Sequence, residues 1–173
     1  NARIPTVAVG KIDDLFAGRG IMRPLHIRSD DEGMDAVASE LASTRSGLIF
    51  ANLVDFDTLY GHRNDVAGYA ANLERFDGRL RDLLPRLHID DLLIVTADHG
   101  NDPTTPSTDH SREYVPLLAT GPRVEGGVEL GTRRTFADLG QTIAENFGVG
   151  AMAHGTSFLG DLHLDKGING EYS

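Results

Sequence analysis

The 173-residue sequence contains no cysteine. This absence excludes disulfides, thiolate metal ligands and thiol nucleophiles together, so a metal ion would have to be held by Asp, Glu or His side chains. The sequence also lacks a hydrophobic run long enough to cross a membrane and a recognisable signal peptide. We therefore expect a cytoplasmic protein without a membrane partner. Because the chain starts at Asn1 rather than at a methionine, we also expect it to be a fragment.

Positive charge is scarce, since 16 Lys and Arg residues stand against 26 Asp and Glu residues and give a formal net charge of −10. This balance argues against a surface that binds nucleic acid or an anionic membrane, because few cations are present to displace counterions from a polyanion. An anionic substrate would need metal ions to be held. A hydrophobic share of 40% with 24% charged residues is typical of a globular chain, and the length favours one domain.

Short apolar runs bounded by turn residues provide the candidate strands. Each run is nearly continuous, which is typical of buried parallel strands. The four runs cover residues 6–9, 47–53, 92–96 and 115–119.

Helical patterns fill the stretches between these runs. Ser29 and Glu32 have the spacing of a capping box, which predicts a helix that reaches about residue 43. Pro85 ends a second helix that begins near residue 66, and Thr135 precedes a third at 136–146. Strands that alternate with helices predict an α/β fold, a layered sandwich with a mostly parallel sheet flanked by helices. Ligands of such sheets gather at the carboxyl ends of the strands.

The first chemical cluster follows the expected strand at 47–53. Asp57 and His62 are a carboxylate and an imidazole five residues apart, and a loop that leaves a buried strand can turn both onto one ion. A plainer alternative stays open, because Asp is a common turn residue. In that alternative Asp55 and Asp57 cap the next turn and His62 is a surface histidine.

The second cluster is denser. The run at 92–96 leads directly into Asp98, His99 and Gly100, and the glycine permits a sharp exit of the backbone. His110 comes eleven residues after His99, in a loop that must return before the run at 115–119. A lone Asp-His pair also arises from capping or by chance. Groups of this kind at the ends of several strands nevertheless favour a metal site.

The segments NLVDFDTLYGHR, TADHGNDPTTPSTDH and HSREYVPLLATGP together resemble the phosphopentomutases, metal-dependent members of the alkaline phosphatase superfamily. The resemblance extends over residues 9–159. It implies two Mn²⁺ ions, one held by Asp57, His62 and His110 and the other by Asp98 and His99. Oxygen and nitrogen ligands without sulfur suit Mn²⁺, although raw affinity favours Zn²⁺. Such dications would neutralise the phosphate of a sugar phosphate.

The family interconverts ribose 1-phosphate and ribose 5-phosphate, and their deoxy forms, through a phosphothreonine that glucose 1,6-bisphosphate primes. That threonine, a further metal-binding aspartate and a cap domain belong to an N-terminal part that this sequence does not match. The resemblance therefore implies that residues 1–173 are the C-terminal part of the metal-binding catalytic core domain. No catalytic nucleophile is expected in this chain, which would be inactive without the missing segment or a separate piece that supplies it.

Three basic residues complete the expected site. Lys11 resembles a family lysine that contacts the substrate phosphate, and its alternative is a solvated lysine at a strand end. Arg63 and Arg112 could orient carboxylates around the ions, as the guanidinium group does well. Their alternative is a surface salt bridge, with Asp65 for the first and Glu113 for the second.

Two other functions stay open. One is a metal-dependent phosphatase or phosphodiesterase of the same superfamily, in which water takes the place of the sugar hydroxyl. The other is a catalytically inactive fragment that binds metal. The LYGHR and HSREYVP segments favour the mutase.

Overall fold

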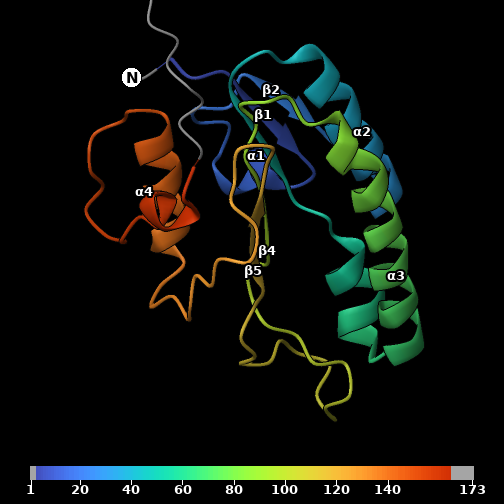
Figure 1. The fold of residues 1–173 in the computed structure, drawn as a ribbon. Helices are drawn as coiled ribbons and strands as arrows, with labels where there is room; N and C mark the ends of the chain where they lie inside the picture. The colour runs from blue at the N-terminus through green and yellow to red at the C-terminus, as the bar shows by residue number, and fades with distance from the viewer. Residues whose placement is uncertain (1–2, 165–173) are drawn as a thin grey trace, which may run out of the picture. The chain divides into compact units, whose positions relative to one another are not determined.

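The computed structural model describes residues 3–164, and Figure 1 labels its helices and strands. The chain forms two compact units. Unit 1 contains the chain up to Arg86 together with His99–Tyr114. Of the described residues, unit 2 contains Leu87–Asp98 and residues 115–164. No helix within residues 3–164 is long and apolar enough to cross a membrane.

Unit 1 is built on a three-stranded parallel sheet. Strand β1 (Thr6–Val9) lies between β2 (Arg23–Leu25) and β3 (Leu48–Ala51). The runs at 6–9 and 47–53 are thus confirmed as strands. Strand β2 has no apolar signal, because it is three residues long and contains Pro24. Proline is tolerated there because β2 is an edge strand.

Three helices accompany this sheet: α1 (Ile12–Leu15), α2 (Asp30–Ser43) and α3 (Val66–Leu83). The Oγ of Ser29 accepts the N–H of Glu32 at 3.2 Å, which confirms the predicted start of α2. Figure 1 shows α2 and α3 running alongside each other, and Arg86 on the turn after α3 donates to the backbone oxygen of Ala38 at 3.2 Å. The buried apolar residues of this unit are Val7, Ala8, Val9, Ile12, Met34 and Leu83.

Unit 2 contains strands β4 (Leu93–Thr96) and β5 (Leu117–Thr120), helix α4 (Ala137–Asn146) and the short turn η4 (Leu159–Leu162). Both apolar runs are confirmed as strands, but their expected parallel direction is wrong. They pair antiparallel, with Leu93 opposite Thr120. A parallel pair needs a crossover that returns the chain to the same end of the sheet, usually through a helix, and none lies between β4 and β5.

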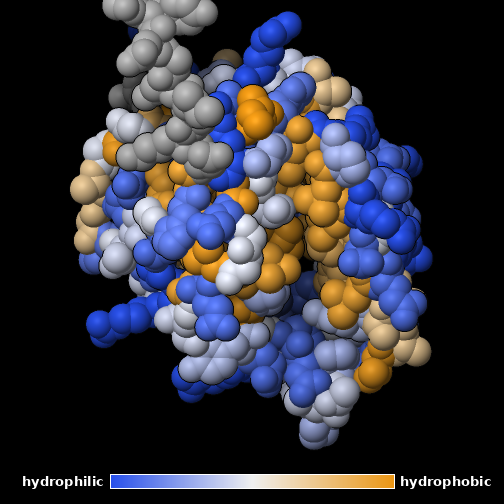
Figure 2. All heavy atoms as spheres, in the orientation of Figure 1, coloured by the Kyte–Doolittle hydropathy of each residue, from blue (hydrophilic) through white to orange (hydrophobic). Residues whose placement is uncertain are grey.

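The architecture is α/β, with a parallel sheet flanked by helices, as the sequence predicts. Not all hydrophobic side chains are enclosed. Figure 2 shows hydrophobic residues in patches on the drawn face, between hydrophilic ones. Among the most exposed large hydrophobic residues are Leu15, Met22 and Tyr114.

Candidate metal centre

Asp57 and His62 lie on two consecutive helical turns that follow β3, where the sequence predicts a loop. Asp57 is on the π-helical turn η1 (Phe56–Tyr60), and His62 is on the 3₁₀ turn η2 (Gly61–Arg63). Thr58 anchors η1, because both its N–H and its hydroxyl donate to the backbone oxygen of Val54 at 2.9 Å. Short π-helical turns are often found at functional sites.

A second segment of unit 1, His99–Tyr114, brings two more imidazoles to the same place. An isolated antiparallel bridge joins Gly100 to Ser111, so His99 and His110 lie next to each other although they are eleven residues apart. A Cβ atom on Gly100 would lie 2.6 Å from the backbone nitrogen of Glu113 and 2.7 Å from the backbone oxygen of Ser111. The glycine therefore permits a close approach of two backbones rather than an unusual turn.

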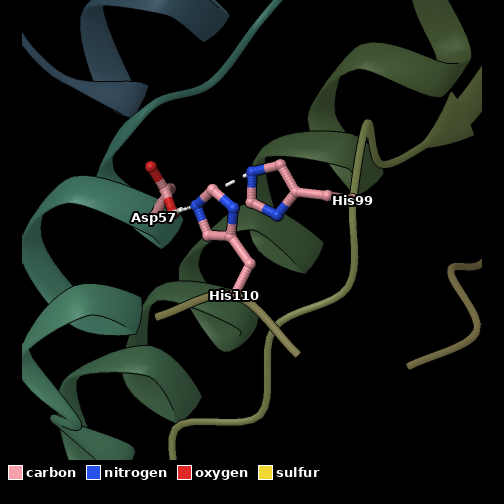
Figure 3. A group of neighbouring side chains, drawn as sticks. All are labelled: Asp57, His99 and His110. Carbon is pink, nitrogen blue, oxygen red and sulfur yellow. Dashed lines mark ion pairs between the residues drawn. The ribbon is translucent and has the colours of Figure 1, made fainter. Parts of the chain in front are cut away.

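Three imidazoles converge on one carboxylate oxygen, and Figure 3 draws two of them, those of His99 and His110, together with Asp57. The Nε2 atoms of His62 and His110 each lie 3.3 Å from the Oδ1 of Asp57, and the Nε2 of His99 lies 3.9 Å from it. The ligand atoms of Asp57, His99 and His110 all lie within 4.8 Å of one another. The rings of His62 and His110 are tilted by 33°, with centroids 4.8 Å apart.

The donor set fits a cation. Asp57 Oδ1 is buried, yet it makes no hydrogen bond within residues 3–164. A buried oxygen without a hydrogen bond is costly, whereas a bound cation would satisfy it together with the surrounding nitrogens. One carboxylate oxygen and imidazole nitrogens are ligands that suit divalent transition metals.

Backbone carbonyls orient two of the imidazoles. The Nδ1 of His62 lies 2.7 Å from the backbone oxygen of Thr108, and the Nδ1 of His99 lies 3.2 Å from that of Gly100. Because a carbonyl oxygen only accepts, Nδ1 carries the hydrogen in both rings and donates it. In the neutral ring the lone pair is then on Nε2, and the Nε2 of each of these two histidines faces Asp57. Metal-binding histidines are commonly held by such a bond from the second ring nitrogen.

Two asparagines that the sequence did not single out connect the segments that carry the ligands. Asn64 has a left-handed backbone, with φ of 50°, and its Nδ2 donates to the backbone oxygen of Thr105 at 2.8 Å. Asn101 packs against Gly61, where a Cβ atom would lie 3.0 Å from the Cγ of Asn101. The only sequence signal for Asn64 is that asparagine tolerates this backbone conformation.

The environment of Asp57 also affects a neighbouring phenol. The ring of Tyr69 contacts Phe56 edge to face, with centroids 5.4 Å apart. Burial raises the pKa of Tyr69, and the negative charge of Asp57 raises it further. The Tyr69 phenol is therefore neutral at ordinary pH.

The remaining predicted residues lie as follows. Asp98 directly precedes His99 in the chain, is exposed and belongs to unit 2. Lys11 is exposed at the start of α1, and the side chains of Arg63 and Arg112 are exposed in unit 1. The predicted division of ligands placed His99 apart from Asp57, whereas all three imidazoles of the cluster face the same Asp57 oxygen.

Comparison with protein families gives a match that covers most of the chain. The sequence model of the metalloenzyme superfamily matches residues 14–151. The chain belongs to this superfamily. Membership and the Asp57 cluster together support a divalent metal ion at this centre.

The chain is similar to curated phosphopentomutases. It is 55% identical to that of Caldanaerobacter subterraneus over 93% of its length, 53% identical to that of Acetivibrio thermocellus over 90%, and 54% identical to that of Desulfitobacterium hafniense over 90%. The chain spans only 41%, 40% and 40% of these three proteins.

Solved structures support the fold. One is a Leishmania mexicana phosphoglycerate mutase, solved at low cobalt concentration. The match covers 87% of this chain and 36% of the mutase chain, with a TM-score of 0.67 and 19% identity. Another is the PH0037 protein of Pyrococcus horikoshii. The match covers 69% of this chain and 33% of the PH0037 chain, with a TM-score of 0.57 and 17% identity. At these identities the likeness concerns the fold alone.

Proposed function

We propose that this chain is the C-terminal part of the catalytic core domain of a phosphopentomutase. This isomerase moves a phosphate between the 1- and 5-positions of ribose or deoxyribose. The observation that carries the proposal is the convergence of three imidazole Nε2 atoms on Asp57 Oδ1, within a chain that is 53–55% identical to phosphopentomutases. Sugar phosphates are the substrates, and the cytoplasm is the compartment.

Two Mn²⁺ ions are the proposed metals. Asp57, His62 and His110 would hold one ion, and Asp98 and His99 the other. A pair of bound divalent ions supplies charge neutralisation for a transferring phosphoryl group. The carbonyl of Thr108 lies 2.7 Å from the Nδ1 of His62, whose Nε2 lies 3.3 Å from Asp57 Oδ1, and this orientation supports His62 as a ligand of the same ion as Asp57.

The nucleophilic threonine of this proposal would lie in a part of the phosphopentomutases that this chain does not span, since it spans only 41%, 40% and 40% of the three relatives. Two threonines near the ligands are engaged otherwise: the hydroxyl of Thr58 donates to Val54, and that of Thr96 donates to the backbone oxygen of Pro116 at 2.8 Å. Glucose 1,6-bisphosphate is the proposed activator. Lys11 would contact the substrate phosphate, and Arg63 and Arg112 would orient carboxylates near the ions.

A chimera tests this proposal. The chain replaces the part of the Caldanaerobacter phosphopentomutase that it matches, and the purified protein is loaded with Mn²⁺ and supplied with ribose 1-phosphate. We expect ribose 5-phosphate without release of inorganic phosphate. The matched controls are His110→Ala, which should abolish turnover, and His163→Ala, which changes an exposed histidine paired with Glu125.

Other outcomes of the same assay contradict the proposal. Release of inorganic phosphate as the main product would favour the phosphatase alternative. A folded chimera that holds Mn²⁺ and forms neither product would favour an inactive metal-binding chain.

A further inference from the structure

Two buried aspartates join the start of α2 to the start of η1. The carboxylate of Asp55 accepts the backbone N–H of Asp30 at 2.8 Å, and the carboxylate of Asp30 accepts the backbone N–H of Asp55 at 2.9 Å. Asp30 is only 7% exposed and Asp55 only 8% exposed. Each side chain therefore satisfies a backbone donor at the start of the other's helical turn, where donors lack partners within the helix.

A third helix supports this pair. Asn72 of α3 is 3% exposed, and its Nδ2 donates to Asp30 Oδ2 at 2.8 Å. Arg75 in turn donates to Asn72 Oδ1 at 2.9 Å and to the hydroxyl of Tyr60, the last residue of η1, at 3.3 Å. The network thus reaches both ends of the π-helical turn that carries Asp57.

The network cannot be replaced by a simple apolar contact. Asp30 uses Oδ1 for the Asp55 N–H and Oδ2 for Asn72, so both its oxygens are acceptors. Burial raises the pKa of Asp30, and the hydrogen bonds from the Asp55 backbone and from Asn72 oppose that rise. A buried polar network with all partners present fixes one arrangement of the backbone.

We infer that Asp30 and Asp55 are positioning residues that set the direction of the Asp57 carboxylate toward the three imidazoles. Asp55 precedes η1 directly and lies two residues before Asp57, so its backbone orientation determines how the first residues of η1 leave the sheet. The inference rests on the proposed function, because it requires Asp57 to hold a metal ion.

The chemistry of the pair distinguishes conservative replacements. Asn at position 30 offers one acceptor and one NH₂ group, so a donor would face a donor at one of the two hydrogen bonds. Asn at position 55 keeps an oxygen that can accept the Asp30 N–H, whereas Ala at position 55 has none.

The test measures Mn²⁺ affinity by calorimetric titration of the 173-residue chain, with urea unfolding of each variant in parallel. We expect Asp30→Asn and Asp55→Ala to lower the affinity about 10- to 100-fold, as loss of a supporting partner does at metal sites. Asp55→Asn should restore most of the affinity that Asp55→Ala loses. Ser29→Ala is the matched control, because it removes the cap of the same helix without touching the pair.

The outcomes separate the two proposals. If the unmodified chain binds no Mn²⁺, this inference fails, whereas the proposed function is decided by the chimera, which supplies the part that this chain does not span. If it binds Mn²⁺ and Asp30→Asn binds equally tightly, only this inference fails. It also fails if Ser29→Ala loses as much affinity as Asp30→Asn for the same loss of stability. If Asp30→Asn does not fold, the Mn²⁺ affinities of Asp55→Ala and Asp55→Asn are compared instead. The inference then fails if Asp55→Asn binds Mn²⁺ no more tightly than Asp55→Ala.

Discussion

The imidazole rings of His99 and His110 are stacked, with centroids 3.8 Å apart and planes inclined by 21°. The bridge between Gly100 and Ser111 holds this arrangement, and both Nε2 atoms face Asp57 Oδ1. A change at either histidine or at the bridge should therefore alter the same centre.

Replacement of His110 by alanine should weaken metal binding strongly, because it removes a nitrogen 3.3 Å from Asp57 Oδ1. Loss of an outer partner costs about 10- to 100-fold in affinity, so loss of a ligand should cost at least about 100-fold. Titration with Mn²⁺ measures the change. The control is His163→Ala, which should bind Mn²⁺ as the unmodified chain does. Equal affinity in both variants would contradict the assignment of His110.

Replacement of Gly100 by alanine should separate the stacked rings. The new Cβ would overlap the backbone of Ser111 and Glu113, which cannot move as a side chain can. Such overpacking costs about 1–3 kcal/mol in the free energy of unfolding, and Mn²⁺ affinity should fall as well. Gly78→Ala is the control, since the nearest atom is 3.7 Å away and alanine is favoured in a helix. A Gly100→Ala chain with unchanged stability and affinity would contradict the role of the bridge.

Much of the fold could be predicted from the sequence, and the exceptions have physical reasons. The capping box of Ser29 and Glu32 marks the start of α2 because its bonds are local. Apolar runs locate β3 and β4 but contain no information on strand direction, so they do not predict the antiparallel pairing of β4 with β5. Strand β2 cannot be predicted from its own composition, because its pairing with β1 makes it a strand.

For the candidate site as well, the sequence indicates the residues but not the tertiary contacts between them. The spacing of Asp57, His62, His99 and His110 singles them out, and the structure brings these four together. The sequence did not predict that they share one carboxylate oxygen. Nor did it predict the pair of Asp30 and Asp55, because that pair joins residues 25 apart through tertiary contacts.

Acid should weaken unit 2 through Asp138. The N–H of Thr156 donates to Asp138 Oδ1 at 2.8 Å, and this bond, with the charge of Arg133, lowers the pKa of the buried Asp138. Because the unfolded pKa is about 3.9 and the folded one is lower, the carboxylate stabilises the fold above about pH 3.9. That stabilisation is lost as the pH falls through the folded pKa.

The variant Asp138→Asn should therefore unfold at lower urea than the unmodified chain at neutral pH, and the difference should shrink below about pH 4. Urea midpoints at several pH values measure it. Asp90→Asn removes an exposed ion pair with Arg123 and should change little at any pH. A difference for Asp138→Asn that does not depend on pH would contradict the assignment of the lowered pKa.

Thr142 holds two segments of unit 2 through one buried hydroxyl. It donates to the backbone oxygen of Asp138 at 2.7 Å and accepts the N–H of Phe158 at 3.0 Å, and both Thr142 and Phe158 are fully buried. Thr142→Val keeps the shape but leaves the Phe158 N–H without this acceptor, which should cost about 1–3 kcal/mol in the free energy of unfolding. Thr142→Ser keeps the hydroxyl and loses one methyl group, so it should cost only about 0.8 kcal/mol. Urea unfolding of the two variants measures the difference. If Thr142→Val is the more stable of the two, packing of the methyl groups rather than the hydrogen bond to Phe158 holds these segments together.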